Sequence, residues 1–415
     1  MHTAHVAITV LGALVITLGL FSIPIERFIL FSSPGIAMAV GVLVGPAGFG
    51  WISSQRPWPE SAGTLALASE LTMAIALMGI ALRLQPRYFL RNSKTMAVLL
   101  LVVMPLMWAS TSILVHLIAG IPLVVAMLIG AILTPTDPVL STTVVHGKVA
   151  EENLPSRIRE VVSAESGAND GLAYPLVYLP LLLLTKPAER IAQEWLLNVL
   201  VFEVGGAILL GAVFGGLTGR AMVWGEKRKM VEAPSLLAFT LALSLLTLGA
   251  AELVGVNGIL AVFAAGLGFG AATPVEDRSS EEKIQEAVNQ FFAVPIFTLF
   301  GIFLPWQEWL ELGWRGFWLV TAILLLRRLP VMMLLRRWIA LLGSARDAAF
   351  VGWFGPMGVA ALFYATQAES KTGHHEVWVL SSLVVFSSVI IHGATGTPLT
   401  RWYGERAAKS QSSRA

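Results

Sequence analysis

The chain alternates between long apolar runs and short polar links along almost its whole length. An apolar run of about 20 residues is the length that an α-helix needs to cross a bilayer. On this criterion we predict about 13 membrane-spanning segments. They begin near His5, Ser33, Gly63, Met96, Ile121, Arg157, Glu194, Pro234, Val256, Ala287, Phe317, Ala348 and Val377. Because the links leave no room for a soluble domain, the pattern predicts an all-α polytopic membrane protein.

Composition supports the same class. Hydrophobic residues make up 56% of the chain and charged residues 13%, whereas a soluble domain carries about 25% charged residues. A net charge of +2 gives no reason to expect nucleic acid as a partner. The absence of cysteine from the sequence excludes disulfides, thiolate metal sites and thiol catalysis. We therefore expect the lipid bilayer to be the main surroundings of the chain.

Lys and Arg gather in the links that follow every second segment. These residues are Arg83, Arg87, Arg91 and Lys94; Lys148, Arg157 and Arg159; Arg220, Lys227, Arg228 and Lys229; Arg336, Arg337 and Arg346; and Arg401 and Arg406. Links rich in basic residues stay in the cytoplasm. We therefore expect a multi-pass protein of the cell (inner or plasma) membrane, with its N-terminus outside and residues 401–415 as a short cytoplasmic tail.

Two segments carry residues that interrupt helices. Pro135 and Pro138 lie in the fifth segment, and Gly355, Pro356 and Gly358 lie in the twelfth. Proline removes an amide donor and clashes with the preceding turn, so both helices should open there. With the seventh segment as a hinge, each break falls in the fifth member of a group of six. This correspondence predicts two inverted six-helix repeats with broken helices crossing near the midplane. A plainer explanation is that Pro and Gly are common in membrane helices.

The sixth segment contains polar residues at bilayer depth. Glu165, Ser166, Asn169 and Asp170 precede an almost wholly apolar stretch. A carboxylate at the bilayer centre costs about 2.5–3.5 kcal/mol, so such residues usually serve ion or proton pathways. Ser166 and Asp170 are four residues apart and share a helix face, as do Glu165 and Asn169. One face can thus present the Asp170 carboxylate and the Ser166 hydroxyl to an ion.

The break in the fifth segment can complete that site. Opened backbone near Thr136 would expose carbonyl oxygens, and Asp137 would add a carboxylate. Oxygen ligands suit a hard cation such as Na⁺. We expect the metal ligands to be Asp170, Ser166 and Thr136, with Asn169 and Asp137 beside them. The plainer alternative is that neighbouring helices simply satisfy Asp170.

Two arginines fall near the middle of the eleventh segment. Apolar residues continue on both sides of Arg327 and Arg328. Neither side chain can easily reach the membrane surface, so a buried carboxylate partner is expected. Glu165 is the candidate for this structural ion pair. The alternative is that the segment ends at Arg327 and both arginines lie beside the membrane. For Glu203, inside the seventh segment, we favour a packing hydrogen bond over a role in transport.

Several motifs occur in a fixed order along the chain. They are Thr136-Asp137-Pro138, Glu165-Ser166-x-x-Asn169-Asp170, Val256-Asn257-Gly258-Ile259-Leu260-Ala261-Val262-Phe263-x-Ala265-Gly266, an arginine in the eleventh segment, and His392-Gly393-x-Thr395-x-Thr397-Pro398-Leu399. With this ordered set the chain resembles the monovalent cation:proton antiporters, on the sodium/proton exchanger (NhaP-like) branch. The resemblance extends from Pro34 to Leu399.

The resemblance implies an organisation and an activity. Residues 95–185 and 313–400 would form an ion-transporting core, while residues 1–90 and 194–305 would form scaffold and dimerisation helices. Such a protein exchanges Na⁺, or Li⁺ or K⁺, for H⁺ by alternating access, as a homodimer and without a cofactor. It is a transporter and no enzyme.

The resemblance also implies roles for single residues. The aspartate that matches Asp170 binds a cation and a proton in alternation, and the serine that matches Ser166 helps to bind the cation. Asn169 stands where the electrogenic branch has a second aspartate, which implies electroneutral exchange. The glutamate that matches Glu165 pairs with the arginine of the eleventh segment.

Two details of the resemblance concern basic residues. Of the two arginines, Arg327 fits the family pattern better, because an aliphatic residue, Val331, follows it four positions later. Arg328 stays open as the alternative. Met357 stands where many relatives have arginine, so any regulatory role of that basic residue is missing from this chain.

Other functions remain open. A K⁺/H⁺ antiporter of the same fold would use the same ligands. A carrier of anions or organic solutes could share the inverted repeats, although three carboxylates near one arginine favour cations. An intramembrane aspartyl protease would need two facing aspartates, and Asp137 and Asp170 could form such a pair. The chain lacks the Gly-x-Gly-Asp setting of such enzymes.

Overall fold

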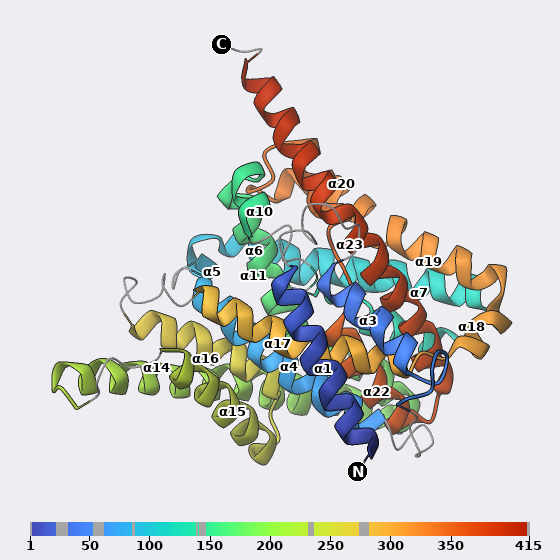
Figure 1. Ribbon diagram of the computed structural model, residues 1–415, viewed down its shortest axis with the longest axis horizontal. Helices are drawn as coiled ribbons and strands as arrows, with labels where there is room; N and C mark the ends of the chain where they lie inside the picture. Colours follow the sequence, from blue (N-terminus) through green and yellow to red (C-terminus); the bar gives the residue numbers. More distant parts are fainter. Residues whose placement is uncertain are drawn as a thin grey trace.

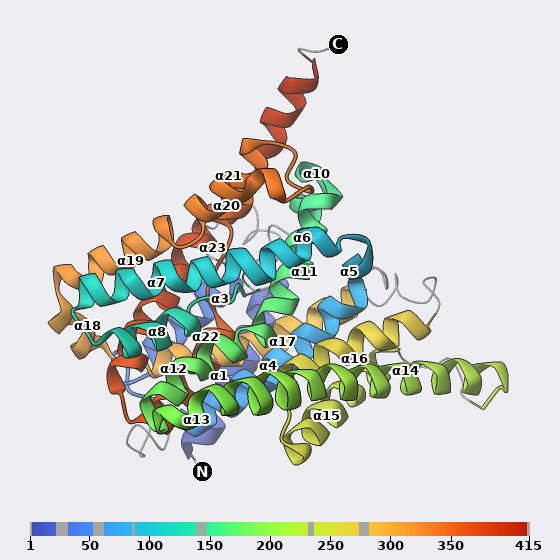
Figure 2. The same ribbon diagram turned by 180° about the vertical axis from the view of Figure 1, so that it is seen from behind.

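The computed structural model describes most of the chain. The described ranges are 2–21, 32–52, 62–84, 88–137, 140, 147–230, 236–273 and 282–412. Within them the chain forms helices and no strands, which confirms the predicted all-α class. In both views of Figures 1 and 2, the start of the first helix and the end of the last helix lie at opposite ends of the molecule.

Helices follow the predicted segments closely. The first half of the chain contains α1 (His2–Leu20), α3 (Ser33–Val44), α4 (Ala62–Arg83), α5 (Tyr88–Arg91), α6 (Ser93–Val98), the π-helix η1 (Leu99–Val103), α7 (Met104–Ala119), α8 (Leu123–Ile132), α10 (Gly147–Asn153), α11 (Ser156–Leu172) and α12 (Tyr174–Thr185). The second half contains α13 (Ala188–Gln193), the π-helix η2 (Glu194–Gly205), α14 (Gly206–Lys227), α15 (Leu236–Val254), α16 (Gly258–Ala272), α17 (Glu282–Ile302), α18 (Trp306–Leu312), α19 (Trp314–Leu326), α20 (Leu329–Leu335), the 3₁₀-helix η3 (Arg336–Trp338), α21 (Ala345–Trp353), α22 (Val359–Thr372) and α23 (His375–Ser412). Each predicted segment therefore contains at least one helix.

The lengths of these helices limit what can be said of membrane crossings. Among the described residues, six helical stretches are long and apolar enough to span a bilayer. A seventh arises if the helices at 291–302 and 306–312, bent by 64°, form one span. Several others, such as α8 and α16, are apolar but shorter. The count of 13 crossings and the inverted repeat stay predictions.

Small residues allow the closest helix packing. Helices α14 and α16 run side by side along one flank of the molecule (Figures 1 and 2). A Cβ atom at Gly211 would lie 2.1 Å from the Ala261 carbonyl oxygen, and one at Gly215 would lie 2.0 Å from that of Ala265. Only glycine permits this approach, which is the usual way in which membrane helices gain packing contacts.

Three interruptions of helices meet near the centre of the fold. The backbone is not helical at 133–137, which includes Pro135, or at 354–358, which includes Gly355, Pro356 and Gly358. Pro138, the remaining predicted helix-break residue, lies outside the described residues. The third interruption separates α19 from α20 at Arg327 and Arg328, where we expected continuous helix.

A proline explains the third interruption. Pro330 lies in the first turn of α20 and has no amide hydrogen to bond the carbonyl of Leu326, four residues earlier. The two arginines thus stand at the junction between α19 and α20.

Candidate ion-binding site

The two predicted breaks are joined directly to each other. The Asp137 amide donates to the Pro356 carbonyl at 2.8 Å. The Asp137 carboxylate accepts from the amide of Val359 at 2.5 Å and from that of Leu140 at 3.2 Å. A Cβ atom at Gly358 would lie 2.1 Å from this carboxylate, so glycine is required. A carboxylate is favoured at a helix N-terminus, here that of α22. Asp137 therefore holds the two breaks together. Because its carboxylate oxygens already accept these hydrogen bonds, they have fewer lone pairs for a cation than we expected.

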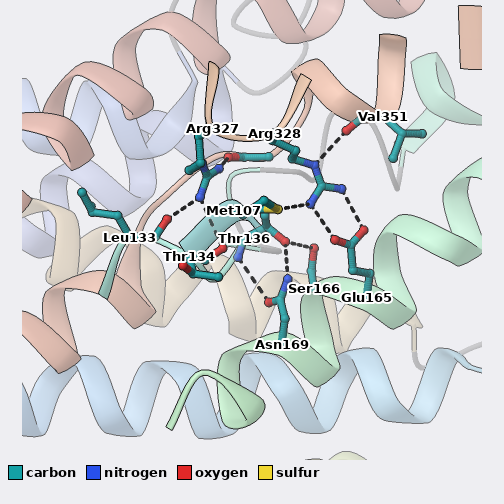
Figure 3. Close-up of polar contacts among 11 residues, drawn as sticks. Met107, Leu133, Thr134, Thr136, Glu165, Ser166, Asn169, Arg327, Arg328 and Val351 are labelled. Carbon is teal, nitrogen blue, oxygen red and sulfur yellow. Dashed lines mark hydrogen bonds and ion pairs between the residues drawn. The ribbon is translucent and has the colours of Figure 1, made fainter. Parts of the chain in front are cut away.

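Arg327 binds the carbonyl groups that the breaks expose. One guanidinium nitrogen donates to the carbonyl of Leu133 and, at 3.3 Å, to that of Thr134 (Figure 3). The other terminal nitrogen donates to the Gly355 carbonyl. The last carbonyl groups of a helix have no intrahelical donor and carry partial negative charge. Arg327 thus donates hydrogen bonds to carbonyl groups that follow the C-terminal ends of both α8 and α21. These bonds link the two broken helices.

Arg328 makes the buried ion pair with Glu165. Its two terminal nitrogens lie 2.5 and 2.7 Å from the two carboxylate oxygens (Figure 3). Its Nε donates to the Val351 carbonyl at 3.0 Å. Both side chains are about 3% exposed. The family pattern favoured Arg327 for this pair, and that preference is wrong: the turn at the α19–α20 junction sends the two neighbouring arginines in different directions.

A small polar network attaches the first break to α11. The Asn169 side-chain amide donates to Thr136 Oγ1 at 2.8 Å, and its oxygen accepts from the Thr136 amide at 3.2 Å. Thr136 Oγ1 lies 3.0 Å from Ser166 Oγ (Figure 3). All three side chains are buried. Asn169 thus fixes Thr136 against α11, and the two hydroxyl oxygens stand together, as a pair of ligands would.

Asp170 is the group in this region that still requires a partner. The residue is 2% exposed. Among the described residues, nothing makes a hydrogen bond to its Oδ1 atom. A buried polar atom left unsatisfied costs about 1–3 kcal/mol, and more when it is charged. Ser166 lies one helical turn away on the same helix. The geometry therefore offers Asp170 to a proton or a cation.

The sequence analysis missed two residues that support the site. The Tyr364 hydroxyl, on α22, donates to the Asp170 carbonyl at 2.7 Å. The ring of His392 bonds the Trp353 carbonyl at 3.1 Å, after which the second break begins. His392 belongs to a recognised motif, which was the available signal. Tyr364 gave no signal, because its contact joins elements 194 residues apart.

Met357 lies inside the second break and is fully buried. Its amide donates to Ser388 Oγ at 2.8 Å, and that hydroxyl also lies 3.1 Å from His392 Nδ1. The position where many relatives carry arginine is thus occupied by an uncharged side chain that packs in the protein interior.

A separate polar cluster ties α11, α21 and α23 together. Asp347, at the start of α21, accepts from Arg157 Nη2 at 2.8 Å and from the Tyr403 hydroxyl at 2.6 Å. The amide of Asp347 donates to Ser344 Oγ at 3.1 Å. Burial tends to raise the pKa of Asp347, but hydrogen bonds from Tyr403, Arg157 and Ser344 together hold that pKa below its ordinary value. This ionised group anchors the N-terminal end of α11, which carries the candidate site.

Comparison with known proteins supports the resemblance seen in the motifs. The family described as "Sodium/hydrogen exchanger, transmembrane" matches residues 10–402. A Na⁺/H⁺ antiporter of Saccharomyces cerevisiae is 29% identical over 429 residues, which cover 96% of this chain and 43% of the yeast protein. This chain also spans about half the length of two further yeast relatives, with 52% and 55% covered. A K⁺/H⁺ antiporter NhaP2 of Shewanella is 24% identical over 402 residues, covering 94% of this chain and 66% of that protein.

A solved structure shares the fold. The sodium proton antiporter MjNhaP1 from Methanocaldococcus jannaschii, at pH 8, superposes with a TM-score of 0.72 and 17% sequence identity. The alignment covers 96% of this chain and 99% of that one. The likeness shows that the arrangement of helices is the same over nearly the whole chain.

Proposed function

This chain belongs to the sodium/hydrogen exchanger family, and from that membership we infer that it exchanges a monovalent cation for protons across a membrane. It is accordingly a transporter and no enzyme. The observation that carries the proposal is Asp170, a buried carboxylate with an oxygen that no described residue satisfies, beside two broken helices. A carboxylate in the membrane interior needs either a proton or a cation to be neutral.

Competition for Asp170 couples the two fluxes. A protonated carboxyl group has little affinity for a metal cation, and a bound cation opposes protonation through its positive charge. Asp170 therefore carries one or the other. If the protein changes its accessible side only when Asp170 is neutral, a cation moving one way obliges a proton to move the other way.

The surrounding oxygens complete a site for a hard cation. The Ser166 and Thr136 hydroxyls are adjacent, 3.0 Å apart. We place the cation between these hydroxyls and the Asp170 carboxylate, with Asn169 holding Thr136 in position. The Asp137 carboxylate, which accepts from the amides of Val359 and Leu140, contributes mainly its negative charge.

The other charges near the site balance one another. Glu165 is neutralised by Arg328, and the positive charge of Arg327, whose donors bind carbonyl groups at two helix ends, is offset in the sum by the negative charge of Asp137. Asn169 adds no charge. The site is then neutral with a bound proton and neutral with a bound monovalent cation. Because one charge crossing the membrane is worth about 2.3 kcal/mol per 100 mV, a neutral carrier gains nothing from the potential. We propose one-for-one, electroneutral exchange.

Na⁺ is the cation that we propose, with Li⁺ and K⁺ as alternatives. The yeast relatives are named as Na⁺/H⁺ antiporters, and those from Shewanella as K⁺/H⁺ antiporters. Hydroxyl and carboxylate oxygens bind all three ions, so the kind of ligand does not separate them.

The remaining parts of the proposal concern the whole protein. Residues 95–185 and 313–400 form the moving core, and residues 1–90 and 194–305 form the scaffold through which two copies associate. The protein lies in the cell membrane with its N-terminus outside and its C-terminal tail inside. The start of α1 and the end of α23 lie at opposite ends of the molecule, which supports placing the two termini on opposite sides of the membrane.

A transport assay tests the proposal. The purified protein is reconstituted in liposomes that contain a pH-sensitive dye, and Na⁺, Li⁺ and K⁺ are added in turn at two imposed membrane potentials. We expect proton flux with at least one cation, at a rate that does not change with the potential. Absence of proton flux with every cation would contradict antiport, and rates that follow the potential would contradict electroneutrality.

A further inference from the structure

A line of polar side chains leads away from Asp170. Tyr174 and Tyr178 follow it at intervals of four residues. The backbone stays helical between α11 and α12, because the Ala173 amide bonds the Asn169 carbonyl and the Val177 amide bonds that of Ala173. Residues four apart on a helix lie on one side of it. With a rise of 1.5 Å per residue, the line extends about 12 Å from Asp170 to Tyr178.

Helix α22 contacts both ends of this line. Tyr364 donates to the Asp170 carbonyl at 2.7 Å, and Lys371 donates to the Tyr178 hydroxyl. Tyr364 and Lys371 are seven residues apart, so they lie on the same face of α22. Lys371 is exposed, whereas Tyr364 is fully buried. The line therefore connects the buried carboxylate with the protein surface near the end of α22.

The Lys371 ammonium group occupies a place suited to a monovalent cation. Its nitrogen lies 4.7 Å from the centre of the Tyr178 ring and also contacts the Tyr178 hydroxyl. The Tyr174 ring stacks on that of Tyr178, with 4.0 Å between ring centres. Aromatic faces attract cations, and hydroxyl oxygens bind them. A place that holds an ammonium group in this way offers the same attraction to a free monovalent ion.

Glu203 supplies a carboxylate to the same place. It lies in the π-helix η2, close to the Tyr174 hydroxyl and to the Lys371 charge. Its Oε2 atom is buried and has no hydrogen-bond partner among the described residues. Trp195, also on η2, donates to the Pro175 carbonyl at 2.8 Å and so fixes η2 against α12. Carboxylates inside membranes usually serve transport.

We propose that Tyr174, Tyr178 and Glu203 form an access site, a second binding position for the transported cation between Asp170 and the membrane face where α22 ends. Lys371 fills the access site in the structure as a tethered competitor and withdraws when an ion enters. The inference rests on the proposed antiport function. It replaces the packing role that the sequence suggested for Glu203.

The access site predicts opposite effects for its members. Lys371→Gln removes the competitor, so the Na⁺ concentration for half-maximal exchange should fall about three- to fivefold at that face. Tyr178→Phe removes a hydroxyl ligand and Glu203→Gln removes the carboxylate charge. Each should raise that concentration by a similar factor.

Liposomes with the protein in a single, known orientation provide the test. The initial rate of exchange is measured against Na⁺ concentration, with Na⁺ added to one side and then, in separate samples, to the other. Lys186→Gln and Glu189→Gln are the control variants, because both residues are exposed and follow the last residue of α12, the helix that carries Tyr178. Shifts of opposite sign for Lys371→Gln and Glu203→Gln, at one face only and absent from the controls, would establish the access site.

Other results overturn it. Equal shifts at both faces, no shift in Lys371→Gln, or the same shift in Lys186→Gln would show that Lys371 and Glu203 act only as surface charge or as structural residues. If the wild-type protein exchanged protons with none of the added cations, the antiport function itself would be refuted. The two failures are thus distinguishable.

Discussion

Asp170 and Asn169 are adjacent in sequence, yet the structure gives them different tasks. Asn169 uses both ends of its amide to hold Thr136 against α11. Asp170 keeps an oxygen that no described residue satisfies. At the scale of the residue, the proposed function follows from this difference: we propose that the satisfied amide positions the site and that the unsatisfied carboxylate binds the transported ion or proton.

Replacing Asp170 by Asn should abolish exchange. The amide has nearly the same shape but neither takes up a proton in the working pH range nor balances the charge of a cation. The measurement is ΔpH-driven Na⁺ flux in everted vesicles, compared with wild type at equal protein content. A thermal unfolding curve close to that of wild type serves as the folding control. Normal flux in Asp170→Asn would refute the assignment.

The Glu165–Arg328 pair allows a test of which arginine is the partner. Arg328→Met leaves Glu165 charged, buried and unpaired, which should cost about 3–5 kcal/mol of stability. Adding Glu165→Met removes the second charge and should restore most of that loss. Thermal unfolding of the purified variants in detergent measures both effects.

The matched control uses the neighbouring arginine. Arg327→Met should also destabilise the protein, since carbonyl groups at two helix ends lose their donor. Glu165→Met should not rescue it. Rescue of Arg327→Met in place of Arg328→Met would restore the assignment that the family pattern favoured.

At the scale of the element, the site depends on helices that stop. Helices α8 and α21 end near the centre of the molecule, and the freed carbonyl groups attract Arg327. Helix α22 begins there, and the amide of its first residue, Val359, donates to the Asp137 carboxylate. Opposite charges thus lie at opposite helix ends, as the helix dipole favours. The crossing of the broken helices is held by electrostatics as well as by packing.

Gly358→Ala should loosen this crossing. The added Cβ atom would lie 2.1 Å from the Asp137 carboxylate, so either the carboxylate or the start of α22 must move. Overpacking of this kind typically costs about 1–3 kcal/mol. We expect a lower melting temperature and reduced exchange. Gly249→Ala, in α15 with open space around it, is the control and should be neutral or slightly stabilising. Equal melting temperatures for both variants would contradict the packing role of Gly358.

At the scale of the whole molecule, the balance of buried charge decides the response to membrane potential. The charges of Glu165 and Arg328 cancel, those of Asp137 and Arg327 sum to zero, and Asn169 is neutral. Asp170 is then the charge that loading with a cation or a proton neutralises. A protein that moves this site across the field carries no net charge in either loaded state, which is the physical basis of the electroneutral proposal.

Asn169→Asp changes that balance by one charge. If the new carboxylate is ionised in one loaded state, the rate of exchange should respond to potential, with an energy of up to about 2.3 kcal/mol per 100 mV. The assay is dye-reported exchange in liposomes at two potentials set by a K⁺ gradient and valinomycin. Asn169→Gln, which adds no charge but disturbs Thr136 in the same way, is the control. If the exchange rate of Asn169→Asp did not change with membrane potential, the proposal that the charge at position 169 sets the response to potential would be wrong.

Much of the fold was predictable because apolar length and helix-breaking residues are local properties. Apolar runs located the helices, and Pro135 with the Gly355–Pro356–Gly358 stretch marked two interruptions. Pro330 carried the same signal for the third interruption and was overlooked. Whether 13 segments cross the membrane as inverted repeats is a question of helix lengths and tilts, which local patterns do not fix.

The sequence by itself determined the class of protein, the places where helices run and break, and the residues able to bind an ion, since each depends on the cost of placing polar groups in a membrane. Only the tertiary structure decided that Arg328 and not Arg327 meets Glu165, that Asp137 serves α22, and that Tyr178 and Lys371 meet beside Glu203. These pairings join elements far apart in the chain. Which side chains meet depends on how the helices turn and pack, and residue spacing along the sequence does not record this.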